Sequence, residues 1–255
     1  MAWNFFIPVW KKMLEELKAE NIAVLLDKLA ITNRAATALD YYYFVEKPER
    51  EKRIFQFVSP AGMAIACMLP EVKFCLIRGS HASAIISLIN TLMQKFELYK
   101  YYFNTNLPSS AAPGELAFPQ KNIEVNKVYS LKADALCIQA KVDGFQLEKG
   151  YKKGRYFAFA LKEGKLASSC TTNWVSSAFA EIGGATKEQF RKKGLFGWLT
   201  STISKLLLAK NITPLYMFEK GNVGSQRVAE RLGFRDTEGR ELCFYVSRKK
   251  ELNLK

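Results

Sequence analysis

The chain has 255 residues, of which 49% are hydrophobic and 24% charged, and this composition excludes a wholly disordered protein because there is enough apolar material for packed cores. The length allows one large domain or two modest ones. The formal net charge of +14 favours an anionic ligand or surface, or else a lysine-rich surface without a specific partner. No apolar run approaches the roughly 18 residues of a membrane span, so we expect a soluble, cytoplasmic protein with no membrane partner.

The five cysteines form no CxxC pair and are odd in number, a pattern typical of free thiols in a reducing compartment. His81 is the only histidine, and the spacings of metal ligands are absent, so no metal site is expected. His81 precedes an apolar helical stretch, which favours a capping or surface role over a catalytic one.

In the first half of the chain, apolar residues at three- and four-residue spacing predict a helix over residues 9–30. Three short strands are predicted next, at residues 54–58, 63–69 and 72–77. Ser80 is then expected to cap a helix that ends near Leu98. Residues 104–122 are rich in proline and predict a linker, so we place a domain boundary near residue 122.

The second half has a clearer rhythm. Strands are predicted at residues 125–131, 156–161, 165–174, 179–185, 214–218 and 241–246, and helices at 194–209 and 222–232. Residues 133–148 are ambiguous, with a short helix as the expectation. A β-meander followed by helix, strand, helix and strand indicates an α/β chain with a mixed sheet. The predicted domains are residues 1–122 and 123–255.

The segment at residues 186–197 joins a predicted strand to a long helix. Backbone N–H groups at a helix N-terminus are unpaired, and the helix dipole adds partial positive charge there, so this position favours an anion. Arg191, Lys192 and Lys193 add full charges, and Gly194 allows close approach to the backbone. This chemistry suits a pyrophosphate. The alternative is a basic loop that ends in a helix-capping glycine.

A second segment, residues 222–234, reads as a helix with Asn222 as a candidate N-cap and Gly233 as its C-cap. Ser225 offers a further capping hydroxyl one turn into this helix. The alternative is a plain capped helix without a ligand.

Together, in this order and with a helix and a strand between them, the two segments resemble the GNAT N-acetyltransferase superfamily. There the first segment reads Arg/Gln-x-x-Gly-x-Gly/Ala, and the second reads Asn-x-x-Ser/Ala followed by Leu-Gly-Phe. The matching positions here are Arg191, Gly194, Asn222, Ser225, Leu232, Gly233 and Phe234. The resemblance covers roughly residues 125–255 and implies a GNAT fold for this half.

The resemblance also implies acetyl-CoA or another acyl-CoA as cosubstrate. In the family, the strand before the loop binds the pantetheine arm through its backbone, a role that falls here to Gly184, Ala185 and Thr186. The cofactor-binding residues expected in the two segments are Arg191, Lys192, Lys193, Gly194, Leu195, Phe196, Asn222 and Ser225.

Two positions depart from the family pattern. Phe196 replaces the second small residue of the loop, and Ala229 stands where many members have a tyrosine that protonates the thiolate. Glu181 is the candidate general base, since a carboxylate in a partly buried cleft has its pKa raised towards working pH. The alternative is a solvated strand glutamate. Tyr216 and, second, Tyr245 are the candidate acids.

These features lead to an N-acyltransferase that moves an acyl group from coenzyme A to a small-molecule or protein amine. The alternative is a non-catalytic GNAT-fold module that binds coenzyme A as a sensor or scaffold, and Phe196 and Ala229 favour it. Nucleic acid is a less favoured partner because the lysines are spread along the chain. The first half is expected to be a degenerate GNAT-like repeat that shapes the acceptor pocket. The sequence leaves the acceptor and the oligomeric state open.

Overall fold

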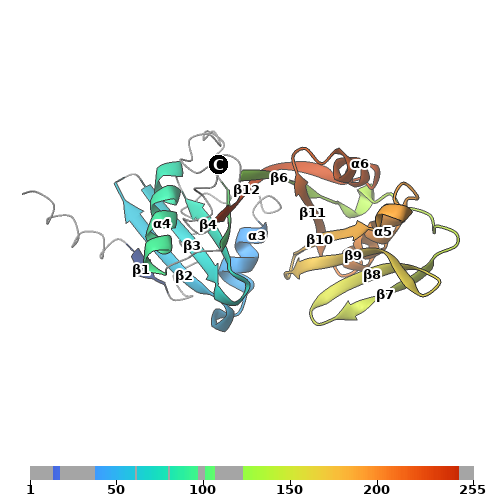
Figure 1. Ribbon diagram of the computed structural model, residues 1–255, viewed down its shortest axis with the longest axis horizontal. Helices are drawn as coiled ribbons and strands as arrows, with labels where there is room; N and C mark the ends of the chain where they lie inside the picture. The colour runs from blue at the N-terminus through green and yellow to red at the C-terminus, as the bar shows by residue number, and fades with distance from the viewer. Residues whose placement is uncertain are drawn as a thin grey trace, which may run out of the picture. The chain divides into compact units, whose positions relative to one another are not determined.

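The computed structural model describes residues 14–17, 38–60, 62–79, 81–96, 101–106 and 123–246, and Figure 1 shows their helices and strands. Contacts divide the chain into two compact units, residues 1–125 with 240–255 (unit 1) and residues 126–239 (unit 2). The division into domains at residues 1–122 and 123–255 stays a prediction. Within the described residues, no helix is both long and apolar enough to cross a membrane.

Unit 1 contains a sheet with the strand order β1-β2-β3-β4-β5-β12. Its strands are β1 (Leu14–Glu16), β2 (Arg53–Ser59), β3 (Gly62–Leu69), β4 (Phe74–Gly79), β5 (Tyr101–Asn106) and the second half of β12 (Arg235–Val246). β4 and β5 are parallel, and the other neighbours are antiparallel. The chain's last described strand thus completes the sheet of the first unit.

The helix α4 (Ala82–Lys95) covers one face of this sheet, as Figure 1 shows. Ile85, Leu88 and Leu92 recur at helical spacing and are fully buried against the β2 rings of Phe55 and Phe57. Each such side chain contributes about 1.5–3 kcal/mol by leaving water. The core of unit 1 therefore lies between α4 and β2–β4.

A second set of buried groups belongs to the residues before β2, in α3 (Ala38–Tyr41) and a π-helical turn (Tyr42–Glu46). Asp40 is completely buried, and its Oδ2 lies 3.5 Å from Nη1 of Arg78 on β4. Lys52 is also buried and donates a hydrogen bond of 2.7 Å to the carbonyl of Phe44. Charged groups buried in this way need such partners because desolvation disfavours the bare ion.

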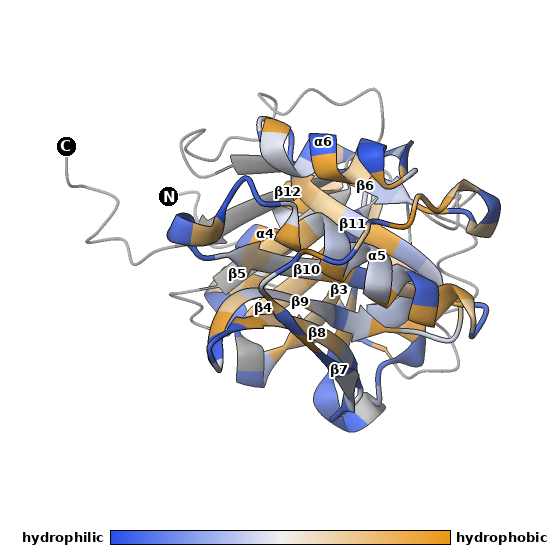
Figure 2. Cartoon of the chain, turned by 90° about the vertical axis from the view of Figure 1, so that its right-hand side faces the viewer, coloured by the Kyte–Doolittle hydropathy of each residue, from blue (hydrophilic) through white to orange (hydrophobic). Residues whose placement is uncertain are grey.

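Unit 2 contains a sheet with the strand order β6-β11-β10-β9-β8-β7. The strands are β6 (Ile123–Ser130), β7 (Gln146–Lys152), β8 (Arg155–Lys162), β9 (Lys165–Val175), β10 (Phe179–Thr186) and β11 (Thr213–Glu219). Only β10 and β11 are parallel among the pairs within this unit. Figure 2 faces this sheet, with hydrophilic residues gathered at the hairpin turn beside β7.

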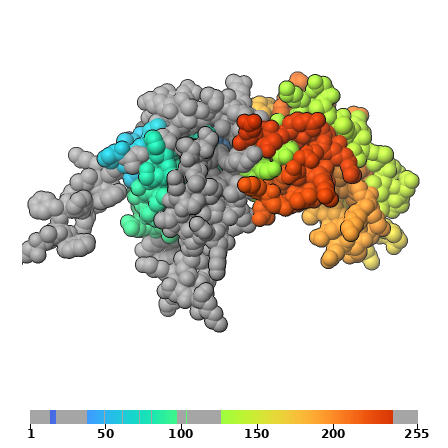
Figure 3. Space-filling model, turned by 90° about the horizontal axis from the view of Figure 1, so that it is seen from above, coloured from blue at the N-terminus to red at the C-terminus, as the bar shows by residue number. Residues whose placement is uncertain are grey.

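The helix α5 (Leu195–Leu208) packs on one face of this sheet through Leu195, Leu199, Ile203 and Leu207, all buried. The shorter α6 (Val223–Arg231) follows β11. Residues 131–145 run beside the end of α6, where the Cys137 N–H donates a hydrogen bond of 3.0 Å to the carbonyl of Leu232. Figure 3 shows α6 in orange-red next to the yellow-green of this segment.

Most of the predicted elements are confirmed, and three predictions are wrong in part. Leu14–Glu16 form a strand instead of part of a helix, because they pair with β2; most of the predicted helix 9–30 lies outside the described residues. Residues 104–106 belong to β5 and not to a linker, because they pair with β4. Residues 133–148 contain only a 3-10 turn (Ala133–Ala135) before β7 begins.

The start of helix α4 also differs from the prediction. His81 occupies the N-cap position of α4 and is exposed, without a capping hydrogen bond from its side chain. Ser80, the predicted cap, lies outside the described residues. His81 thus has the surface position expected from the sequence.

The two units repeat one order of elements. β2-β3-β4 form an antiparallel meander, α4 follows, and β5 returns parallel to β4. β8-β9-β10, α5 and β11 do the same in unit 2. The fold is a mixed-sheet α+β chain with this pattern twice.

Candidate functional site

The edge of β10 that faces β11 is only partly used for strand pairing. Parallel pairing runs from Phe179, opposite Thr213, to Ile182, opposite Tyr216. On its other side, β10 stays paired with β9 as far as Thr186, opposite Ser168. Residues 183–186 therefore extend beyond the last pair with β11, so β11 does not pair with their backbone groups.

A β-bulge lies just before this point. Glu181 is opposite Trp174 and Ile182 is opposite Thr172, so Asn173 is the extra residue of β9. The Nδ2 group of Asn173 donates a hydrogen bond of 2.8 Å to Oε1 of Glu181. A Cβ atom on Gly183 would lie 2.9 Å from the same Nδ2, so the glycine leaves room for this side chain. The bulge thus holds the Glu181 carboxylate in a fixed position.

The carboxyl of Glu181 is half-buried in strand β10. Burial raises the pKa of this carboxyl above its ordinary value, because the charged form loses hydration, while the hydrogen bond from Asn173 opposes the rise. A raised pKa brings the group closer to neutrality, where a general base works best. The role of Glu181 as a general base stays a prediction.

The loop between β10 and α5 has two residues with positive φ. Lys192 has a φ of 63°, and Gly194, the N-cap residue of α5, has a φ of 80°. The first helical hydrogen bond runs from the Trp198 N–H to the Gly194 carbonyl, so the N–H groups before Trp198 precede the helical ladder. Apart from Gly194 itself and its two chain neighbours, no described residue has an atom within 4 Å of the position that a Cβ on Gly194 would take. The helix N-terminus is therefore open in front of this glycine.

The charged residues of this loop lie around that opening. Arg191, Lys192 and Lys193 are all exposed. The Nε of Arg191 donates a hydrogen bond of 3.4 Å to the carbonyl of Thr186, which ties the loop to the end of β10. Three cations next to the positive end of α5 are suited to a multiply charged anion.

Leu195 and Phe196 turn their side chains towards the protein. Leu195 is buried in the core, so only its N–H is available to a ligand. The Phe196 ring lies near Gly184, whose Cβ, if present, would be 2.9 Å from Cε2 of that ring. Its centroid lies 5.9 Å from that of Tyr216 on β11. The ring thus lies near both strands at the level where their pairing ends.

Tyr216 links β11 to α6. Its hydroxyl donates a hydrogen bond of 3.1 Å to Oγ of Ser225, and the Ser225 N–H donates one of 3.0 Å to Oδ1 of Asn222, the N-cap of α6. Burial raises the pKa of the Tyr216 hydroxyl, so it stays protonated at neutral pH; the bond to Ser225 opposes the rise. Asn222 and Ser225 therefore have structural partners within the helix and strand.

The predicted residues fall into two groups that Phe196 connects. One group holds Gly184, Ala185, Thr186 and the loop at residues 191–196, and the other holds Tyr216, Asn222 and Ser225. Glu181 is separate from both, since it lies opposite Leu215, one residue before Tyr216, and so projects from the other face of the sheet. Tyr245 pairs with Tyr102 in unit 1 and is not on a strand next to β10.

Sequence reasoning missed two polar residues of β9. Asn173 holds Glu181, and Ser168 Oγ lies 2.8 Å from Oγ1 of Thr186 and donates to the carbonyl of Ala185. Ser168 was detectable in principle, since it is a polar residue in a strand with a buried face. Asn173 depends on a register shift, for which the sequence carries no signal.

The cysteines whose side chains the structure describes supply no nucleophile to this site. Cys67, Cys75, Cys137 and Cys170 are free thiols, as predicted. Burial raises the pKa of the Cys170 thiol to about 12, so the thiolate is not formed at neutral pH.

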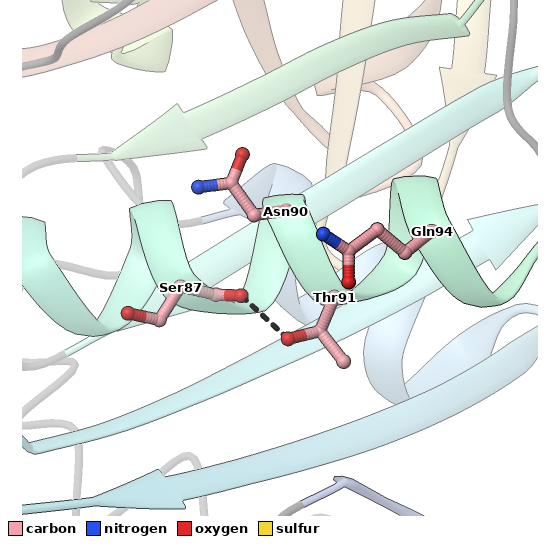
Figure 4. Close-up of a pocket in the computed structure, with 4 residues that line it drawn as sticks. All are labelled: Ser87, Asn90, Thr91 and Gln94. Atoms are coloured by element: carbon pink, nitrogen blue, oxygen red, sulfur yellow. Dashed lines mark hydrogen bonds between the residues drawn. The ribbon is translucent and has the colours of Figure 1, made fainter. Parts of the chain in front are cut away.

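A surface pocket lies elsewhere, on the exposed side of α4 in unit 1. Ser87, Asn90, Thr91 and Gln94 line it, as Figure 4 shows, and Thr91 Oγ1 donates to the carbonyl of Ser87 at 2.8 Å. These side chains are uncharged and include no acid, base or nucleophile of use at neutral pH. The pocket contributes no chemistry to the site in unit 2.

The fold resembles that of several solved structures. A GCN5-related N-acetyltransferase from Kribbella flavida has 12% sequence identity and a TM-score of 0.62, over 88% of this chain and 99% of that one. One from Sphaerobacter thermophilus has 9% identity and a TM-score of 0.62, over 91% and 94%. A tandem GNAT protein from the clavulanic acid biosynthesis pathway has 14% identity and a TM-score of 0.55, over 91% and 97%. At such identities the likeness concerns the fold alone.

A comparison with curated protein sequences gives no match. The family model of the GNAT acetyltransferases matches residues 121–240, which include β10, the basic loop, α5, β11 and α6. Residues 121–240 are therefore a GNAT acetyltransferase domain.

Proposed function

We propose that unit 2 transfers an acyl group from acyl-CoA to a primary amine. The observation that carries this proposal is the coincidence of two features at one place: β10 residues 183–186 extend beyond the pairing with β11, and the exposed basic loop leads into an open helix N-terminus at Gly194. GNAT acetyltransferases typically use acyl-CoA, whose pyrophosphate and pantetheine amides call for these two kinds of group.

The residues fit coenzyme A in charge and in backbone geometry. The N–H groups of the first turn of α5, with Arg191, Lys192 and Lys193, would hold the pyrophosphate. The backbone of Gly184, Ala185 and Thr186 would hold the pantetheine amides. The thioester supplies the activated acyl group.

Glu181 and Tyr216 would carry the proton transfers. Glu181, held by Asn173, accepts the proton that the amine nitrogen loses as it forms its bond to the acyl carbon. The Tyr216 hydroxyl, kept protonated by its raised pKa, donates a proton to the sulfur as the carbon–sulfur bond breaks. The two side chains lie at adjacent register positions on opposite faces of the sheet, so both reach one reacting bond only if that bond lies beyond the last strand pair, Ile182 with Tyr216.

The test is isothermal titration of the full chain with acetyl-CoA, for the wild type and for Gly194→Glu. We expect the wild type to bind with a Kd of roughly 1–100 µM. The variant should bind about 100-fold more weakly or not at all, because a carboxylate repels the pyrophosphate and the left-handed backbone costs about 1 kcal/mol for a residue other than glycine.

Gly164→Glu is the matched control. Gly164 has a φ of 73° and open space around its missing Cβ, like Gly194, but it lies in the β8–β9 turn. This variant carries the same charge and the same backbone cost and should bind acetyl-CoA as the wild type does. Equal binding by all three proteins, or by none, would contradict the proposal.

A second candidate function is a non-catalytic module that binds coenzyme A. Phe196, whose ring lies between Gly184 and Tyr216, and Ala229, which offers no hydroxyl from α6, favour it. Release of free CoA thiol in a panel of small amines and lysine peptides distinguishes the two functions. A sensor would bind acetyl-CoA without releasing thiol, whereas a transferase would release it only with an acceptor.

A further inference from the structure

Phe196 takes the place of a small residue in the loop motif, and its ring has a defined position. It lies on the α5 face of the sheet, close to Gly184 of β10 and 5.9 Å, between centroids, from Tyr216 of β11. It also packs against the hydrophobic core of unit 2. No atom of the ring lies within 4 Å of the position that a Cβ on Gly194 would take, so the ring does not fill the space beside this glycine.

The two strands that the ring touches are those whose pairing ends at Ile182 and Tyr216. Beyond that pair, β10 offers the backbone of residues 183–186, which is where the proposed function places the pantetheine arm. Gly184 has no side chain to contribute here, since a Cβ would collide with the carbonyl of Ser169 as well as approach the ring. Of Gly184 and Phe196, only Phe196 therefore has a side chain that fills space beside residues 183–186 of β10.

Resting on the proposed function, we infer that Phe196 is an aromatic gate that occupies the path of the pantetheine arm, and that coenzyme A binds only when the ring turns aside. The ring acts on the arm and not on the nucleotide, because its contacts are with β10 and β11 and the phosphate side of the loop is open. Phe196 then sets how tightly the unit holds acyl-CoA.

A comparison of two probes tests the gate, coenzyme A and 3′,5′-ADP, which carries the nucleotide end without pantetheine. Phe196→Ala removes the ring, so we expect the Kd for coenzyme A to fall about 10-fold while the Kd for 3′,5′-ADP stays the same. Phe196→Leu, which keeps apolar packing, should give an intermediate value. Thermal unfolding of each variant reports that the unit is folded.

Phe159→Ala is the matched control, because Phe159 is another half-buried aromatic residue of unit 2 and stacks on Phe157 in β8, away from β10 and β11. It should leave both Kd values unchanged. An unchanged or higher Kd for coenzyme A in both Phe196 variants would overturn the gate. So would an equal gain for the two probes, since the ring would then act on the loop.

The outcome also separates this inference from the proposed function. If Phe196→Ala binds coenzyme A more tightly than the wild type does while both bind 3′,5′-ADP equally, the cofactor site and the gate are both supported. If 3′,5′-ADP and coenzyme A bind to neither protein, the proposed cofactor site itself is wrong and the gate falls with it. Binding of both probes with no response to Phe196 rejects the gate alone.

Discussion

In unit 1, residues 80–81 alone join β4 to α4, whereas in unit 2 residues 187–194 join β10 to α5. The longer connection carries the three cations and the left-handed glycine that make the helix N-terminus suitable for an anion. The shorter one has no room for such a loop. The two units thus share an order of elements but differ in the connection between one strand and the helix that follows it.

The sheets differ at the corresponding point. β4 pairs with β5 as far as Arg78, and its register with β3 is unbroken. β10 leaves β11 at Ile182, and its neighbour β9 has a bulge at Asn173. When the first parallel pairs are aligned, Leu76 takes the register position of Glu181, Arg78 that of Gly183, and Thr105 that of Tyr216. Unit 1 closes the strand pair and fills the face of β4 with the Asp40–Arg78 contact, so the same frame serves as a packed domain.

The largest effect is expected from Glu181→Gln, which removes the charge from a position whose counterpart on β4 is the uncharged Leu76. We expect kcat/KM to fall about 100-fold at neutral pH, because the amine loses its base. In the wild type, kcat/KM should fall as pH drops through the folded pKa of Glu181, which lies above that of an ordinary glutamate. The variant should lack this acidic limb. The measurement is the pH profile of thiol release with the amine found in the acceptor panel.

Asn173→Ala is the companion variant. The Asn173 hydrogen bond lowers the pKa of Glu181, so its loss should move the acidic limb to higher pH. For folding the sign is opposite to that of a salt-bridged acid. A raised folded-state pKa gives stability that is full in acid and is lost as pH rises through that pKa, so Glu181→Gln should be no less stable than the wild type at neutral pH. A limb that stays in place in both variants would show that positioning alone drives the reaction.

How much of the fold can be predicted from the sequence depends on the kind of interaction that determines each element. The strands of both meanders and the helices α4, α5 and α6 follow from local periodicity and capping residues, and they were predicted. β1, β5 and β7 were missed. Residues 146–152 form a hairpin with the neighbouring β8. Leu14–Glu16 and residues 101–106, by contrast, become strands by pairing with distant partners. Tertiary pairing of this kind overrides local propensity.

The candidate site divides in the same way. The loop at residues 191–196 and the cap at Asn222 were predicted from local motifs, and the structure places them as a helix N-terminus and an N-cap. The part that Asn173 plays beside Glu181 depends on a one-residue register shift in β9, and the direction of the Phe196 ring depends on packing against β10 and β11. These features follow from the assembled sheet, which no short stretch of sequence encodes.

A second prediction compares two glycines at corresponding register positions of β10 and β4, Gly184 and Gly79. A Cβ on Gly184 would collide with the backbone carbonyl of Ser169, whereas one on Gly79 would lie 2.5 Å from the side-chain atom Cγ1 of Ile85. A side chain can rotate and a paired strand cannot, so we expect Gly184→Ala to cost about 2–3 kcal/mol and Gly79→Ala about 1 kcal/mol. Urea unfolding followed by circular dichroism measures both.

The comparison would lose its basis if the two costs were equal or reversed. Gly184→Ala combined with Phe196→Ala sharpens it, since the ring contact disappears while the contact with Ser169 remains. Only a minor part of the cost should then be recovered. Recovery of most of it would show that the ring, and not the neighbouring strand, demands a glycine.

The smallest effect is expected from Tyr216→Phe, which removes a phenol hydroxyl. The corresponding position of unit 1 is Thr105, which has no phenol. We expect kcat to fall about 10-fold with KM unchanged, because the sulfur loses its proton donor while the ring contacts with Phe196, Phe218 and Phe234 remain. Loss of the bond to Ser225 should cost about 1 kcal/mol of stability. Ser225→Ala should cost a similar amount of stability but keep kcat, because the phenol is still present. If the two variants lower kcat equally, the hydroxyl serves to hold α6 against β11 and the sulfur leaves without its help.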